Sequence, residues 1–204
     1  MERRNFLQST ALLTAFCIPS SSVFSLPTES KDPIKPFLLP GQPPLNHNGG
    51  MDIKVWVRNE ATGGLFSSVE CAVAPKLMGP APHAHKELDE LMYVIEGTAS
   101  VLLGDEVVEI KAGGWHMRPR MIKHTFFNAS DQPLRFIDMY FNQPFEEYLE
   151  AIFFQLTPEN GYPHGSEKKG LEIKRLSDQF GLIRYDNAQK QKQQLIKEYG
   201  LRPD

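Results

Sequence analysis

The chain has 204 residues, which is enough for one domain with a buried core and short extensions but too few for two full-sized domains. Hydrophobic residues make up 41% of the chain and charged residues 23%, so the composition excludes wholesale disorder and a polytopic membrane protein. The net charge of −3 gives no general attraction to phosphate backbones or anionic lipid, and we expect no nucleic-acid partner.

Residues 1–25 have the features of an export signal. Arg3 and Arg4 precede an apolar stretch that is too short to span a bilayer and is broken by Pro19. The run Arg-Arg-Asn-Phe-Leu-Gln is similar to the twin-arginine pattern R-R-x-F-L-K. On this pattern we expect export to the periplasm, with no stable membrane insertion after signal removal. The alternatives are a disordered N-terminus and lipidation at Cys17.

Cys71 is the only cysteine that remains if residues 1–25 are removed, so an intrachain disulfide is excluded in that case. Its neighbours alternate as in a strand. We therefore expect Cys71 to be a small buried residue rather than a nucleophile.

A proline-rich lead segment follows over residues 26–50, and its six prolines exclude the interior of a sheet. Alternating residues separated by Gly and Asp-Gln-Pro turns then predict strands through residues 51–142. Short strands at intervals near ten residues are typical of a β-sandwich or barrel. The predicted strands are 53–57, 65–73, 91–95, 100–103, 107–110, 115–118, 124–128 and 134–140.

The period changes in a C-terminal helical extension, residues 143–204. Apolar residues from Phe145 to Leu156 recur at helical spacing, with Glu146 and Glu147 in the first turn. Further helices are predicted over 167–180 and 187–199, each followed by a glycine.

The candidate chemistry lies between Gly79 and Asn128. His83 and His85 are two residues apart, so in a strand both imidazoles point to one face. Glu90 shares a face of the next predicted strand with apolar residues, where an unpaired carboxylate is costly and a bound cation would remove that cost. His124 is the fourth candidate ligand, and Asp89 is the competing carboxylate.

Two motifs resemble those of the cupin family. Gly79-(x3)-His83-x-His85-(x4)-Glu90-(x6)-Gly97 is similar to the first, and Gly113-(x5)-Pro119-x-Met121-(x2)-His124-(x3)-Asn128 to the second. Two departures are the three residues between Gly79 and His83, where five are usual, and Met121 in place of glycine, which suggests a differently shaped turn.

The resemblance implies an all-β fold, a double-stranded β-helix (cupin or jelly-roll barrel) with C-terminal α-helices. It implies one divalent transition metal ion held by His83, His85, Glu90 and His124, and the six-residue step to Gly97 favours Glu90 over Asp89. Three imidazoles and one carboxylate suit a borderline ion. We favour Mn, Fe or Ni, with Zn, Co and Cu as alternatives, and the resemblance also implies a homodimer.

Among single-domain cupins the sequence is similar to the bacterial quercetin 2,3-dioxygenase-like group, through the Pro82–His85 run, the strand that ends at Gly97, the second motif and the Phe-Glu-Glu-Tyr run at 145–148. This implies a dioxygenase acting on a small aromatic or enol substrate such as a flavonol, with Glu90 as catalytic base. One alternative is a non-catalytic metal- or sugar-binding cupin. Another is a metal-dependent isomerase or epimerase, for which His116 or Tyr140 would supply the acid or base.

Four apolar side chains are expected to fill the barrel and could also form an apolar pocket wall. They are Met92, Val94, Met117 and Phe126. His116 matches no family position, and we expect it at the surface or next to the site.

Overall fold

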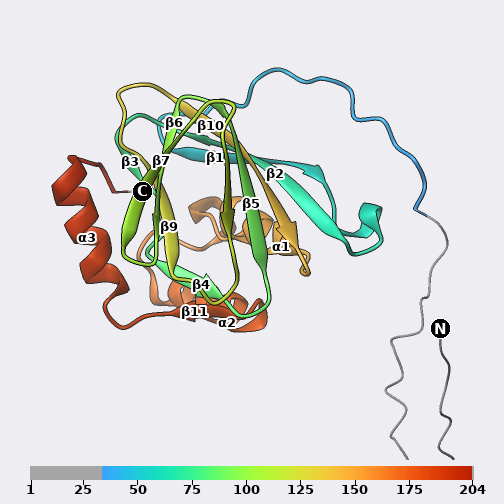
Figure 1. Ribbon diagram of the computed structural model, residues 1–204. Helices are drawn as coiled ribbons and strands as arrows, with labels where there is room; N and C mark the ends of the chain where they lie inside the picture. Colours follow the sequence, from blue (N-terminus) through green and yellow to red (C-terminus); the bar gives the residue numbers. More distant parts are fainter. Residues whose placement is uncertain (1–33, 204) are drawn as a thin grey trace, which may run out of the picture. The chain divides into compact units, whose positions relative to one another are not determined.

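The computed structural model describes residues 34–203, and the export signal predicted for residues 1–25 lies outside the described residues. Within residues 34–203 the strands form two antiparallel sheets that face each other (Figure 1). In spatial order, the first sheet is β1 (Met51–Val57), β2 (Phe66–Val73), β10 (Leu134–Phe141), β5 (Asp89–Glu96) and β8 (Trp115–Arg118). The second is β11 (Leu182–Arg184), β4 (His83–His85), β9 (His124–Asn128), β6 (Thr98–Leu103) and β7 (Glu106–Lys111), with β3 (Leu77–Met78) also paired to β9.

The predicted strands are therefore present, with bounds that differ by at most two residues. Three short strands, β3, β4 and β11, were not among those predicted, because two or three residues are too few for a periodic pattern. Residues 34–50 form neither strand nor helix, as their prolines predict.

The C-terminal part is helical, as predicted. Helix α1 (Phe145–Glu150) continues as a π-helical turn (Ala151–Gln155), in which the Leu156 N–H donates to the Ala151 carbonyl. Helices α2 (Glu167–Gln179) and α3 (Ala188–Tyr199) follow, with β11 between them. No helix in the described part of the chain is long and apolar enough to cross a membrane.

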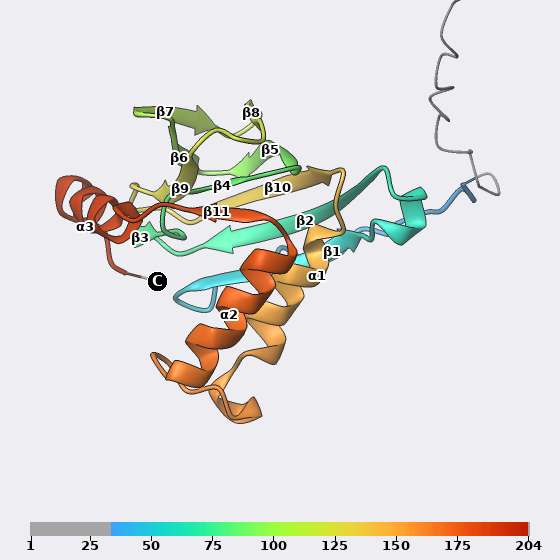
Figure 2. The same ribbon diagram turned by 90° about the horizontal axis from the view of Figure 1, so that it is seen from below.

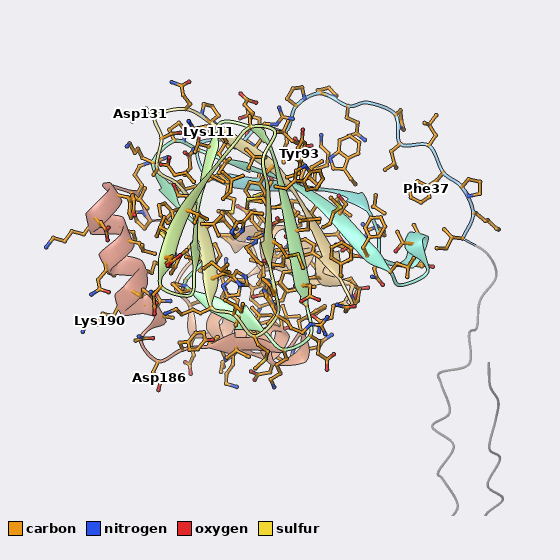
Figure 3. The ribbon with its side chains drawn as sticks, in the orientation of Figure 1. Phe37, Tyr93, Lys111, Asp131, Asp186 and Lys190 are labelled. Carbon is orange, nitrogen blue, oxygen red and sulfur yellow. The ribbon has the colours of Figure 1, made fainter. Side chains whose placement is uncertain are left out.

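The helices cover two different surfaces of the sheets. Figure 2 shows α1 and α2 side by side next to β2 and β11, and their residues Phe145, Leu176 and Phe180 join the main core between the sheets. Helix α3 lies apart from them, where Leu195 packs with Phe127 of β9 in a second, smaller core. Its Lys190 is exposed and points away from the sheets (Figure 3).

Strand alternation decides which side chains enter the space between the sheets. In β5, Met92 and Val94 are fully buried, as predicted, and Glu90 lies on the same face. Met117 was expected inside the barrel, and this was wrong, since its side chain is 43% exposed. In β8 it is the neighbouring residue, Arg118, that is buried, so Met117 faces out.

Candidate metal centre

Three histidines come together at the inner face of the second sheet. His83 of β4 stands opposite His124 of β9, and His85 is two residues further along β4 on the same face. One ring nitrogen from each of the three lies within 4.8 Å of the others, and all three imidazoles are largely or fully buried. Donors bonded to one ion at about 2.0–2.1 Å are at most about 4.2 Å apart, so small side-chain adjustments would close this set on a single ion.

The backbone orients two of the rings. Nδ1 of His83 lies 2.9 Å from the Ala81 carbonyl, and Nδ1 of His124 lies 2.9 Å from the Ile122 carbonyl. Because a carbonyl only accepts, Nδ1 carries the hydrogen in both rings, and in a neutral ring Nε2 then keeps its lone pair. This is the usual arrangement of histidines that bind a metal through Nε2.

The charge state and burial of the rings also suit a metal. Burial lowers the pKa of His83 to about 3, with a smaller effect from His124 and His85, so its imidazole is neutral at physiological pH. Both ring nitrogens of His85 and Nε2 of His124 are buried with no hydrogen-bond partner among the described residues. Unsatisfied buried nitrogens of this kind are rare, and a bound cation would satisfy the ones that face it. The three histidines could therefore hold a metal ion.

Glu90 reaches the histidines from the first sheet. Its Oε1 lies 3.3 Å from Nε2 of His85, and its Oε2 lies 3.1 Å from Nε2 of His124. Asp89 points the other way and accepts hydrogen bonds from Arg120 and Asn142. Of the two candidate carboxylates, the structure thus brings Glu90 to the histidines.

Glu90 also has a cationic partner that the sequence analysis missed. Arg118 Nε lies 3.2 Å from Glu90 Oε2, and the same guanidinium donates to the Asp138 carboxylate. Burial raises the pKa of Glu90, but Arg118 and then His124 outweigh burial and hold the pKa well below its usual range. A bound cation is therefore not needed to offset the burial of Glu90, since Arg118 already pairs with it.

A row of polar side chains crosses the first sheet beside Glu90. Tyr140 of β10, Glu90 of β5 and Arg118 of β8 occupy opposite positions in adjacent strands. The Tyr140 hydroxyl donates to Asp138 Oδ2 at 3.3 Å, and Asp138 is in turn bonded to Arg118. Burial raises the pKa of Asp138, against the opposing effect of Arg118, and burial followed by Asp138 raises the pKa of Tyr140 well above its usual value.

Asp138 and Arg118 carried a signal in the sequence. Leu134, Phe136, Asp138 and Tyr140 alternate along one face of a predicted strand, so Asp138 had to be buried with its apolar neighbours. A carboxylate on such a face requires a partner. Which cation supplies it depends on the pairing of β5 with β8, which only the tertiary structure defines.

The turn before His124 has a left-handed residue at Met121, which replaces the glycine of the family motif. Met121 adopts a φ of +64°, a conformation that glycine favours, and its N–H donates to the His85 carbonyl at 2.8 Å. This hydrogen bond joins the backbone of His85 to the second motif.

His116 lies near the site without facing the cavity described next. It is opposite Met92 on the inner side of the first sheet, is half-buried, and has its pKa lowered by burial and then by Arg118. Tyr140, the other candidate acid or base, does line that cavity.

A cavity of about 440 Å³ opens from the histidines towards the C-terminal helices. The polar residues of its lining include His83, His124, Glu90, Arg118 and Tyr140. Its apolar wall comes from the first sheet, α1, the π-helical turn, α2 and β11. Of the four apolar residues that were predicted to fill the barrel, Phe126 is the one that lines the cavity. The main apolar lining residues are Ile53, Val69, Phe126, Phe136, Phe145, Tyr148, Leu149, Ile152, Phe153, Ile173 and Leu182.

One part of the chain matches a known family model. Residues 69–140, which carry all four candidate ligands, match the family described as the cupin domain. No curated protein sequence matches the chain.

Several solved structures resemble it at low identity. KdgF from Halomonas sp. is 19% identical, with 48% of this chain and 85% of that chain covered and a TM-score of 0.43. The polyketide cyclase RemF from Streptomyces resistomycificus is 24% identical, with 46% and 66% covered and a TM-score of 0.41. A predicted oxalate decarboxylase from Thermotoga maritima is 18% identical, with 45% and 79% covered and a TM-score of 0.42. The match over residues 69–140 fits the fold described above, and the double-stranded β-helix predicted from the sequence is confirmed.

Proposed function

We propose that the protein is a metal-dependent oxidoreductase, a dioxygenase that acts on an aromatic or enol substrate such as a flavonol. The observation that carries this proposal is that His83, His124 and Glu90, with His85 beside them, line a cavity whose wall is otherwise largely aromatic and aliphatic. A cavity of about 440 Å³ is within the usual range for small-molecule sites.

His83, His85, Glu90 and His124 form the ligand set in this proposal. When bound, the metal polarises an oxygen of the substrate and lowers the pKa of its hydroxyl group. Glu90 is ionised, because Arg118 and His124 hold its pKa down, and its carboxylate is then the base that accepts the hydroxyl proton. Arg118 remains paired with Glu90 and Asp138 and keeps the carboxylate oriented towards the histidines.

The cavity wall selects the substrate. The rings of Phe145 and Tyr148 stack with centroids 4.9 Å apart, and the His85 ring packs edge-on against Phe145 at 5.0 Å. A planar aromatic substrate can occupy such a wall by ring contacts while its oxygen atoms point to the histidines.

We further propose that Mn, Fe or Ni is the native metal and that the protein works in the periplasm. Raw affinity favours Cu and Zn over Mn and Fe, so folding in the cytosol before twin-arginine export would let the chain close around a weaker-binding ion. Protein purified from the periplasm with stoichiometric Zn and full activity would contradict this proposal.

A homodimer is also part of the proposal. The edge strand β8 and the turn after it carry exposed apolar side chains that a second copy would cover, namely Trp115, Met117, Met121 and Ile122. Sedimentation of a compact monomer at micromolar concentration would contradict it.

Proton transfer without O2 is a second candidate, because Tyr140 lines the cavity. Its raised pKa keeps the hydroxyl protonated, so Tyr140 could act as the general acid and Glu90 as the base of an isomerase or epimerase.

Oxygen uptake distinguishes these functions. The protein, after metal analysis, is presented with a panel of flavonols, catechols and β-diketones, and a variant with His83→Ala and His85→Ala serves as the control. A dioxygenase consumes O2 with at least one member of the panel only when the histidines are intact. Solvent-proton exchange into a bound enol without O2 uptake would instead favour the isomerase, and neither signal would favour a non-catalytic binding cupin.

A further inference from the structure

The strand next to the metal-binding strand comes from the C-terminal extension. β11 pairs antiparallel with β4, so that Leu182 stands opposite His85 and Arg184 stands opposite His83. His83 is in turn opposite His124, which gives the row Arg184, His83, His124 across the second sheet. Opposite residues of antiparallel strands project to the same face of a sheet. Arg184 therefore lies on the histidine side of the sheet, and it is among the residues that line the cavity.

Arg184 differs from Arg118 in how far its charge is already neutralised. Arg118 is buried and paired with both Glu90 and Asp138, so little of its charge is left for a ligand. The Arg184 side chain is 46% exposed, and its one ion pair among residues 34–203 is a contact of 3.6 Å to Asp178. Asp178 is itself engaged by Lys174 at 2.6 Å. The guanidinium of Arg184 is thus a cation with unused donor capacity at the wall of the cavity.

The cavity lining consequently carries a polar group besides the candidate ligands. Arg184 lines it from β11, in the strand next to His83, together with Leu182 and Tyr185. We propose that Arg184 binds a carboxylate borne by the apolar substrate, while the reacting oxygen of that substrate points to the histidines. A guanidinium recognises a carboxylate through paired N–H donors, and partial enclosure strengthens such charge-assisted bonds. The proposal rests on the proposed function for the position of the reacting end, and it narrows the aromatic or enol substrates considered there to those that also bear a carboxylate.

Ligand binding tests this without requiring turnover. The full chain is saturated with Zn²⁺, which is redox-inert, and titrated with 6-hydroxy-2-naphthoate and with its neutral isostere 6-hydroxy-2-naphthamide by calorimetry. We expect the acid to bind more tightly than the amide. Arg184→Gln should weaken binding of the acid about 10-fold or more and leave binding of the amide unchanged, since only the acid loses a charge-assisted contact. Arg184→Lys should retain part of the affinity for the acid.

Arg175→Gln is the matched control. Arg175 lies on α2, is 58% exposed, pairs with Glu172 and does not line the cavity. The Arg175→Gln variant should bind both the acid and the amide with the affinities of the unmodified protein. Equal affinity of the acid for the unmodified protein and Arg184→Gln would overturn the proposal, as would no preference for the acid over the amide or no binding of the acid at all. These readouts are independent of O2 uptake, so the proposed function and the role of Arg184 can fail separately.

Discussion

Glu90 and Arg118 stand opposite each other on β5 and β8, with Glu90 Oε2 3.2 Å from Arg118 Nε and both side chains buried. The carboxylate that reaches His85 and His124 from one side is thus held by a guanidinium from the other. Arg118 in turn binds Asp138, so one cation serves two buried carboxylates.

Arg118→Gln should destabilise the fold by about 3–5 kcal/mol, because Glu90 and Asp138 would remain buried without a cationic partner. The free energy of unfolding from urea denaturation measures this effect. Arg120→Gln is the control, since Arg120 pairs with Asp89 at the surface and its loss should change stability little. Equal losses of stability in the two variants would contradict a stabilising role for the buried pairing of Arg118 with Glu90 and Asp138.

Replacing His83 and His85 together with alanine should abolish stoichiometric binding of a transition metal, because two of the three converging imidazoles are removed. Metal per chain is measured by plasma mass spectrometry after purification. His116→Ala should bind as much metal as the unmodified protein, since His116 does not line the cavity. Unchanged metal content in the double variant would refute the candidate centre.

Met121→Gly should stabilise the protein by about 0.5–1 kcal/mol. Met121 has a φ of +64°, which costs a residue with a Cβ about 1 kcal/mol or more, and its side chain is 62% exposed, so little packing is lost. The increased flexibility of glycine in the unfolded chain offsets part of the gain. A lower melting temperature of the Met121→Gly variant would contradict this prediction and would mean that the Met121 side chain makes stabilising contacts outside its own chain.

Gly97→Ala should destabilise the fold by about 2–4 kcal/mol. Gly97 has a φ of +79°, and a Cβ there would lie 2.3 Å from the Pro133 carbonyl oxygen, so both strain and overlap result. Gly104→Ala isolates the strain, because Gly104 has a φ of +62° with no atom within 4 Å of the added Cβ, and it should cost only about 1 kcal/mol. Chemical denaturation of both variants would reveal whether the close approach at Gly97 exists.

Cys71 should resist alkylation in the folded protein. Burial raises the pKa of its thiol well above the usual value, which lowers the thiolate fraction at any given pH, and the residue is only 6% exposed. In a Cys17→Ser background at pH 8, iodoacetamide should modify one thiol per chain only after unfolding, as measured by mass spectrometry. Rapid labelling of the folded protein would place Cys71 at an accessible position.

Much of the fold could be predicted because its signals are local. Alternation in residues 51–142 located the longer strands, and the change to helical spacing after Pro144 located α1, α2 and α3. The spacing of His83, His85 and His124 with Glu90 identified residues that the structure brings together. The missed strand β11 carries no periodic pattern of its own, since its three residues are held by pairing with β4.

The sequence by itself determined which residues could alternate inward and which histidines could share a face. These properties depend on the two-residue alternation of side-chain direction within a single strand. Only the tertiary structure decided that Arg118 pairs with Glu90 and Asp138, and that Arg184 lies beside His83. These contacts join strands that are far apart in the sequence, and their register is set by the packing of the two sheets and by the return of the C-terminal segment to the edge of β4.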